Sequence, residues 1–215
     1  MWITYRHKAT YERDVPIDTA KNTWRRRLRT RRDVMSDQVK DDADHRLVIS
    51  LAKIDLHDHF SASPGADVAA YVPVGAEPGS LVMLDALVGN GYEVLLPVVV
   101  PGPPAPLRWA RYSGPESLTT GRFGLLEPTG PTQPPSTVDD AELILVPALA
   151  VDRQGVRLGR GAGYYDRSIA GVPRNRLVAV VYDEELVDVL PAGEFDVAMG
   201  WALTPTAGFT RLGTT

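Results

Sequence analysis

LILVPALAVDRQGVRLGRGAGYYD, residues 143–166, is the stretch that decides the fold. Residues 142–147 predict a buried strand, because strands that are buried on both faces read as continuous apolar runs. Glycines at 159, 161 and 163 form a loop, after which we expect a helix over 164–170. A strand, a glycine-rich loop and a helix in succession are typical of a parallel α/β sheet.

The remainder of the chain continues this alternation. Helices are expected at 18–34 with Asp18 as N-cap, after Ser36, with Pro78 in a first helical turn, and at 184–190. Strands are expected at 69–74, 92–100, 109–112, 176–182 and 197–201. We therefore predict one α/β domain over 18–215, with a mostly parallel sheet covered on both faces, and an N-terminal extension of uncertain order over 1–17.

The composition excludes several kinds of protein. The 215 residues are 44% hydrophobic and 23% charged, as in an ordinary globular protein, and the lack of cysteine rules out disulfides, thiolate metal sites and a cysteine nucleophile. The net charge of −4 argues against a nucleic-acid partner, and the longest apolar run, near 143–151, is too short to cross a membrane. We expect a cytoplasmic enzyme without a nucleic-acid or membrane partner.

The glycine-rich loop has features of a phosphate-binding site. Alternate glycines let the backbone approach a ligand and turn its N–H groups toward an anion, and the following helix would add a partial positive charge. Arg157 and Arg160 add full charges, and Asp166 is placed to hold Mg²⁺ against phosphate oxygens. The loop is neither a Walker A motif nor a GxGxxG Rossmann turn, and glycine triplets alone often serve only to turn a chain.

A basic run at residues 21–32 stands out in this acidic protein. Lys21, Arg25, Arg29 and Arg32 recur at helical spacing, and no acid lies within the run. An anionic ligand would explain this face, and so would an ordinary solvated helix surface. The segment after residue 177 is, by contrast, strongly acidic.

Residues 145–167 resemble the signature of the 5-formyltetrahydrofolate cyclo-ligase family, which reads approximately VPGLAFD..G.RLG.G.GYYDR. Weaker matches extend the resemblance over about residues 20–206. They are Lys21 with Arg25, Tyr71-Val72-Pro73 with Glu77, Phe123-Gly124 with Glu127-Pro128, Leu190-Pro191 with Asp196, and Thr204-Pro205. Three positions depart from the family pattern: Ala148 replaces a Gly, Val151 a Phe, and Glu185 a common Gln that can donate a hydrogen bond.

The resemblance implies a three-layer α/β/α fold and a role for each matched residue. Lys21 and Arg25 would contact the phosphates of ATP, and Lys21 and Arg160 would be the catalytic pair. Asp166 and Asp196 would hold Mg²⁺. The ATP cradle would consist of Arg157, Leu158, Gly159, Arg160, Gly161, Ala162, Gly163, Tyr164 and Tyr165. The folate would contact Val72, Glu77 and Phe123 together with Arg160, Gly161, Ala162, Gly163 and Tyr164.

The activity implied by the resemblance is the ATP- and Mg²⁺-dependent conversion of 5-formyltetrahydrofolate, with or without a polyglutamate tail, to 5,10-methenyltetrahydrofolate. ATP would phosphorylate the formyl oxygen, N10 would attack the activated carbon, and ADP and phosphate would leave. We expect a monomer or a weak homodimer. Two other functions stay open: an ATP-dependent ligase of the same fold that acts on another substrate, and a non-catalytic protein that binds folate or nucleotide.

Overall fold

A computed structural model describes residues 16–54, 56–121 and 124–213, and its centre is a seven-stranded sheet of order β12-β11-β9-β6-β1-β2-β3. Neighbouring strands from β11 to β2 run parallel, whereas the edge strands β12 and β3 are antiparallel to their neighbours. The strands are β1 (Asp67–Ala69), β2 (Glu93–Val98), β3 (Arg108–Tyr112), β6 (Leu143–Pro147), β9 (Leu177–Val180), β11 (Trp201–Thr204) and β12 (Gly208–Arg211). The predicted α/β class with a mostly parallel sheet is confirmed.

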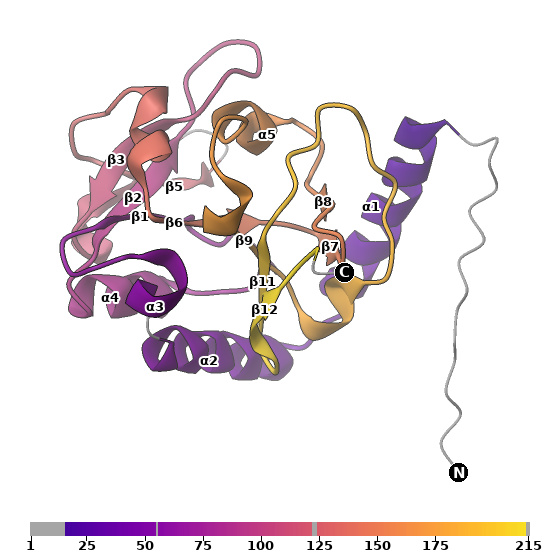
Figure 1. Cartoon of the computed structure of the whole chain (residues 1–215), viewed down its shortest axis with the longest axis horizontal. Helices are drawn as coiled ribbons and strands as arrows, with labels where there is room; N and C mark the ends of the chain where they lie inside the picture. Colours follow the sequence, from indigo (N-terminus) through magenta and orange to yellow (C-terminus); the bar gives the residue numbers. More distant parts are fainter. Residues whose placement is uncertain (1–15, 55, 122–123, 214–215) are drawn as a thin grey trace.

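The two faces of the sheet are covered differently. Alternate residues of β6 point to opposite sides, so Leu143 and Leu145 join one buried cluster, whereas Ile144 and Val146 join the other. Helices α2 (Asp37–Lys53) and α4 (Leu81–Gly89) pack on the first face, with the short α3 (Leu56–Phe60) beside them (Figure 1). The second face is covered by short pieces, α5 (Tyr164–Ser168) and the 3₁₀ turn η3 (Pro135–Asp140), and the turn η4 (Arg174–Arg176) leads into β9.

Helix α1 (Ile17–Asp33) packs against a second, three-stranded sheet and not against the main one (Figure 1). This small sheet has the order β10-β7-β8, with β7 (Ala150–Asp152), β8 (Arg157–Leu158) and β10 (Leu186–Val187). Leu28 of α1 meets Leu149 and Leu158 in a third buried cluster. Because β8 leads directly into the glycine-rich loop, this packing holds α1 beside that loop. The remaining elements are the hairpin of β4 (Leu118–Thr120) and β5 (Leu126–Pro128), and the turns η1 (Pro115–Ser117) and η5 (Asp183–Glu185).

Several predicted element boundaries are wrong. Helix α1 begins at Ile17 after Pro16, so Asp18 lies in its first turn and is not the N-cap. Ser36 does cap α2, since its side chain accepts a hydrogen bond from the Val39 amide at 3.4 Å. Pro78 precedes α4 because Asp44 binds the Gly79 amide at 2.7 Å and holds that segment outside the helix.

The C-terminal half contains the largest error. The predicted helix at 184–190 is instead the turn η5 followed by β10, because Leu186 and Val187 pair with β7. The strand expected at 69–74 ends at Ala69, and the one expected at 197–201 begins at Trp201. The predicted extension over 1–17 lies outside the described residues except for Pro16 and Ile17. Among the described helices, none is long and apolar enough to cross a membrane.

Candidate functional site

A cavity of about 1120 Å³ opens where the parallel strands end, between α1 and the glycine-rich loop. Its walls include Val72 just after β1, Val99 just after β2, and Ala148 just after β6. Ligands of open α/β sheets bind at this edge, beyond the carboxyl ends of the strands. Pockets for one ligand usually measure about 300–1,000 Å³, so this cavity is slightly larger than the upper end of that range.

The cavity brings together every predicted site residue that the structure describes. Its lining includes Lys21, Arg25, Val72, Glu77, Asp196 and the whole stretch from Arg157 to Asp166. Phe123, predicted to contact the folate, lies outside the described residues. These residues come from segments far apart in the sequence, and their individual roles remain a prediction.

The glycine-rich loop is shaped so that arginines can lie against its backbone. Gly161 and Gly163 have φ values of 111° and 70°, a region that favours glycine. A β-carbon on Gly161 would lie 3.4 Å from Cζ of Arg25, which is an ordinary contact distance, so the positive φ is what favours glycine there. Helix α5 has only five residues, and the positive charge at the loop therefore comes mainly from arginines and not from a helix dipole.

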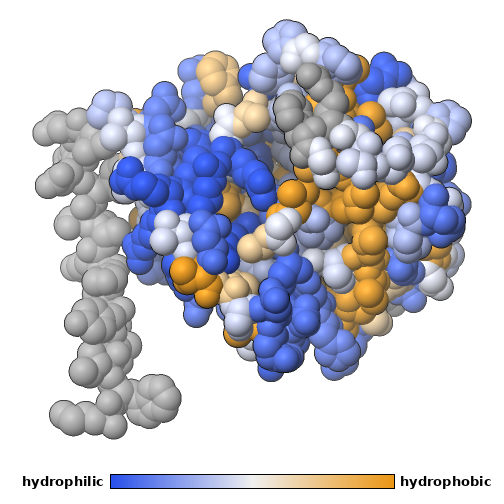
Figure 2. Space-filling view, turned by 180° about the vertical axis from the view of Figure 1, so that it is seen from behind, coloured by the Kyte–Doolittle hydropathy of each residue, from blue (hydrophilic) through white to orange (hydrophobic). Residues whose placement is uncertain are grey.

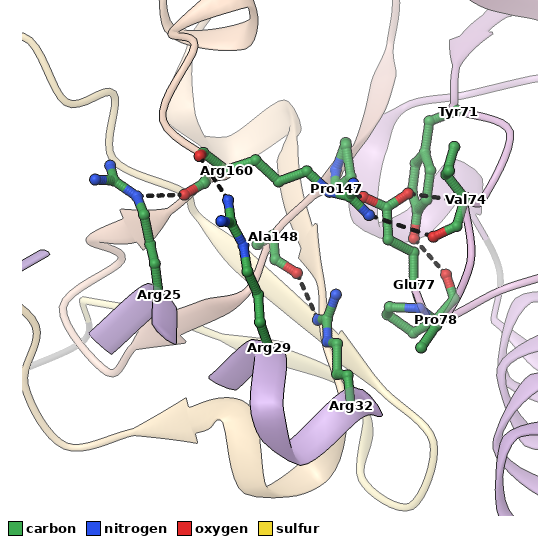
Figure 3. Close-up of polar contacts among 12 residues, drawn as sticks. Arg25, Arg29, Arg32, Tyr71, Val74, Glu77, Pro78, Pro147, Ala148 and Arg160 are labelled. Atoms are coloured by element: carbon green, nitrogen blue, oxygen red, sulfur yellow. Dashed lines mark hydrogen bonds and ion pairs between the residues drawn. The ribbon is translucent and has the colours of Figure 1, made fainter. Parts of the chain in front are cut away.

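Helix α1 is tied to this loop by hydrogen bonds to backbone carbonyls (Figure 3). Arg25 Nε donates to the Gly159 carbonyl at 3.0 Å, and Arg29 Nη2 donates to the Arg160 carbonyl at 3.0 Å. Sequence reasoning assigned Arg25 but gave Arg29 no place in the site. Hydrophilic side chains gather over the part of the molecule where α1 lies (Figure 2).

Both carboxylates that were predicted to bind a metal are paired with a basic side chain in this structure. Asp196 accepts from Lys21 Nζ at 2.6 and 2.7 Å, and Asp166 accepts from Arg157 Nη2 at 2.6 Å. Within the described ranges, no cluster of three or more histidine, aspartate or glutamate residues could hold a metal alone. Mg²⁺ usually binds one or two protein carboxylates together with phosphate oxygens and water, so the metal role of Asp166 and Asp196 stays a prediction.

Glu77 lies at another wall of the cavity and is held in one orientation (Figure 3). Arg160 Nε is 2.8 Å from Glu77 Oε1, and the Val74 amide donates to Oε2 at 2.9 Å. Tyr165 lies near this carboxylate, and burial followed by the charge of Glu77 raises its pKa, so its hydroxyl stays protonated. The Tyr165 hydroxyl and Arg157 Nε are buried without a hydrogen-bond partner in the described part of the chain, and both residues belong to the lining of the cavity.

Arg32 and Glu185 form a buried ion pair behind the cavity that the sequence prediction missed. Arg32 Nε and Nη2 donate to the two Glu185 oxygens at 2.8 and 2.7 Å. Arg32 Nη2 also donates to the Ala148 carbonyl at 2.7 Å, as Figure 3 shows. Burial alone lowers the pKa of Arg32, but the hydrogen bond and charge of Glu185 raise it above its usual value. Glu185 is therefore the counterion of Arg32 in this chain. The same arginine also holds the carbonyl group of Ala148 in place.

A signal for these pairs was present in the sequence. The acid-free basic run at 21–32 and the acidic segment after residue 177 are complementary in charge. The structure joins them through Lys21–Asp196, Arg31–Glu184 and Arg32–Glu185. The separation of the two runs by more than 140 residues made the pairing invisible to local pattern analysis.

Comparisons with known proteins agree with this fold and site. The sequence profile of the 5-formyltetrahydrofolate cyclo-ligase family matches residues 17–205. A 5-formyltetrahydrofolate cyclo-ligase of Mycolicibacterium smegmatis is 51% identical over 152 residues, which is 69% of this chain and 78% of that protein. The solved structure of Aquifex aeolicus 5,10-methenyltetrahydrofolate synthetase is similar, with a TM-score of 0.71 and 27% identity over 91% of this chain and 94% of the other.

A 5,10-methenyltetrahydrofolate synthetase from Mycoplasma pneumoniae shares the fold at 20% identity, with a TM-score of 0.63 over 85% of this chain and 96% of that one. The fold and the family match together define the class of protein as an α/β ligase. The chain belongs to the 5-formyltetrahydrofolate cyclo-ligase family. The family resemblance and the class of enzyme predicted from the sequence are thereby confirmed.

Proposed function

We propose that this protein converts 5-formyltetrahydrofolate to 5,10-methenyltetrahydrofolate in a reaction that consumes ATP and requires Mg²⁺. The observation that carries the proposal is the large cavity in which basic side chains of α1 face basic side chains of the glycine-rich loop. Basic side chains on two walls can contact a triphosphate from both sides, which supports the proposal because phosphoryl transfer depends mainly on alignment and charge neutralisation.

The contacts along the cavity support an order for the two substrates. Lys21 and Arg25 lie one turn apart on α1, and Arg25 reaches Gly159 of the loop. The next residue, Arg160, extends to Glu77 on the opposite wall. We infer that the triphosphate lies along Lys21, Arg25 and the glycines, and that the pterin ring of the folate lies toward Glu77 and Val72.

This order gives each residue a physical task. Lys21, Arg157 and Arg160 would neutralise charge that builds up as the γ-phosphoryl group of ATP moves to the formyl oxygen. The carboxylate of Glu77 would accept hydrogen bonds from the N–H groups of the pterin ring and so fix N10 near the formyl carbon. N10 then forms the new C–N bond, the C–O bond to the phosphorylated oxygen breaks, and phosphate leaves together with the proton that N10 loses.

Asp166 and Asp196 are the residues that would hold Mg²⁺. When bound, the ion would neutralise part of the triphosphate charge. The carboxylates would then turn from Arg157 and Lys21 toward the ion, which leaves these two cations available to the phosphates.

The test is a turnover assay with 5-formyltetrahydrofolate, ATP and Mg²⁺, followed by the near-ultraviolet absorbance of 5,10-methenyltetrahydrofolate. We expect that band to appear, and excess chelator to abolish it. ATP consumption that a different carboxamide or carboxylate stimulates, without the band, would favour a ligase of the same fold with another substrate. Binding of folate and nucleotide without any turnover would favour a non-catalytic protein.

A further inference from the structure

The backbone around Glu77 is fixed by hydrogen bonds from side chains. Glu77 lies in the segment 70–80, which connects β1 to α4. The hydroxyl of Tyr71 donates to the Pro78 carbonyl at 2.6 Å (Figure 3), and the hydroxyl of Tyr182 donates to the Ala76 carbonyl at 3.3 Å. Burial and then the charge of Glu77 raise the pKa of Tyr71 well above its usual value, so this hydroxyl remains a donor. Both neighbours of Glu77 in the sequence are therefore held through their carbonyl groups.

A third hydrogen bond reaches this segment from helix α2. Oδ1 of Asp44 accepts from the Gly79 amide at 2.7 Å. Lys40, one helical turn earlier, pairs with Asp44 and donates to the Gly79 carbonyl at 3.5 Å. Gly79 has a φ of 103°, a backbone conformation that favours glycine. The two side chains of α2 therefore hold both polar backbone groups of a bend that few other residues would adopt.

A carboxylate at position 44 is costly for the protein, because the residue is only 7% exposed. Leu47 and Leu51 of the same helix belong to the apolar cluster on this face of the sheet. A buried ion pair often stabilises a fold no better than apolar residues of similar size, because both charges lose their hydration. Stability is therefore a poor explanation for Asp44, and its contact with the Gly79 amide provides a better one.

The segment that Asp44 holds presents Glu77 to the cavity. The Val74 amide and Arg160 Nε lie 2.9 and 2.8 Å from the two Glu77 oxygens, and Arg160 Nη2 donates to the Val74 carbonyl at 3.3 Å (Figure 3). Asp44 itself is not among the described residues that line the cavity. A shift of Gly79, two residues after Glu77, would thus move the carboxylate without changing any group on the cavity wall.

We propose that Asp44 is a positioning residue for the folate, which acts by holding Gly79 and thereby fixing Glu77. The inference rests on the proposed function, since it assumes that Glu77 binds the pterin ring. The triphosphate is assigned to α1 and the glycine-rich loop, so the effect of Asp44 should fall on the folate and not on ATP. The effect should be measurable, because a displacement of about 1 Å at a binding group can cost about 100-fold in rate.

The test is isothermal titration of the full-length protein with 5-formyltetrahydrofolate and, separately, with ATP. Asp44→Ala removes the acceptor of the Gly79 amide, and should weaken folate binding about tenfold and change ATP binding by less than about twofold. Asp44→Asn keeps a carbonyl oxygen at this position and should restore the folate affinity to within about threefold of the wild type. Leu51→Ala removes a buried side chain two turns further along α2, and urea unfolding measures the stability lost in each variant.

Leu51→Ala should lose stability and keep the wild-type folate affinity. Unchanged folate affinity in Asp44→Ala would overturn the proposal, and so would an equal loss in Leu51→Ala, an equal loss for ATP, or a failure of Asp44→Asn to restore binding. If Asp44→Ala does not fold, Lys40→Met replaces it, because it removes the partner of Asp44 and the donor to the Gly79 carbonyl. That variant should weaken folate binding roughly threefold, and an unchanged folate affinity would likewise overturn the proposal.

The titration also separates this inference from the proposed function, because binding needs no turnover. An inactive wild type whose folate affinity falls in Asp44→Ala would contradict the proposed function alone. An active wild type whose folate affinity is the same in Asp44→Ala would contradict this inference alone. A wild type that binds no 5-formyltetrahydrofolate would contradict both.

Discussion

Two ion pairs line the cavity, Lys21–Asp196 and Arg157–Asp166, and a third, Arg32–Glu185, lies behind it. All three join a basic side chain to a carboxylate, but they differ in their access to solvent. The carboxylates of Asp196 and Asp166 keep 20% and 26% of their side-chain surface exposed, whereas that of Glu185 keeps 6%. Their cations are all nearly buried, at 10% for Lys21, 4% for Arg157 and 5% for Arg32. The pairs at the cavity thus open on one side only, toward the place where a ligand would bind.

This difference separates an exchangeable pair from a permanent one. A carboxylate that faces the cavity can release its cation when a phosphate or a metal ion replaces it. The Arg32–Glu185 pair also binds the Ala148 carbonyl and the Tyr182 amide, so no comparable replacement is available to it. We expect the cavity pairs to matter for activity and the buried pair to matter for stability.

The largest effect is expected on stability from Arg32→Met. This change leaves the Glu185 charge buried without its partner, which typically costs about 3–5 kcal/mol of unfolding free energy. Urea unfolding of the variant measures the loss. Arg31→Met is the matched control, because Arg31 and Glu184 are exposed at 45% and 74% and such pairs contribute at most about 1 kcal/mol. Equal losses of unfolding free energy in the two variants would show that the buried pair contributes no more to stability than the exposed pair.

Lys21→Ala is expected to reduce activity more than stability. Losing one preorganised charge at the triphosphate should cost roughly 2–4 kcal/mol in the transition state, seen as a fall in kcat/KM. The Asp196 carboxylate stays partly exposed after the change, so the unfolding free energy should fall less than in Arg32→Met. Steady-state kinetics and urea unfolding of the same sample give both quantities. A variant that is active but unfolds readily would make Lys21 a structural residue.

Asp166→Asn is expected to raise the Mg²⁺ concentration needed for turnover and to lower kcat at saturating folate. Asparagine keeps the shape and one oxygen but removes the charge that a hard cation prefers. Its amide oxygen can still accept from Arg157, so stability should change by at most about 1–2 kcal/mol. Folate affinity in the absence of ATP should not change.

Titrating activity with Mg²⁺ measures this effect, and Asp188→Asn provides the control because Asp188 is 86% exposed and pairs only with the exposed Arg153 among the described residues. If Asp166→Asn and Asp188→Asn show the same metal requirement as the wild type, Asp166 is not a metal ligand.

The fold class and the outline of the site could both be predicted from local patterns in the sequence. Buried strands such as Leu143–Pro147 are continuous apolar runs, and the glycine-rich loop is a local pattern, so both are readable from short windows. The prediction of a helix at 184–190 was wrong because Leu186 pairs with Val151 in a sheet, and local propensity carries no information about such a tertiary contact. The Lys21–Asp196 and Arg32–Glu185 pairs were not predicted for the same reason, since each joins the first helix to a residue far along the chain.

The smallest effect is expected from deleting residues 1–15. Helix α1 begins at Ile17 and the family match begins at residue 17, so the described site contacts all remain. Turnover should change by less than about twofold, as is usual when a terminal segment outside the packed elements is removed. Kinetics of the shortened protein test this prediction, and a folded but inactive product would place part of the site in those residues.

The most direct test of the account is the stoichiometry of the reaction. Wild-type protein is mixed with 5-formyltetrahydrofolate, ATP and Mg²⁺, and ADP and 5,10-methenyltetrahydrofolate are quantified in the same sample. The account predicts that the two products appear in equal amounts, and that omitting the folate, the ATP or the metal ion abolishes both. Methenyltetrahydrofolate formed without ADP, or ADP formed equally well without folate, would contradict it.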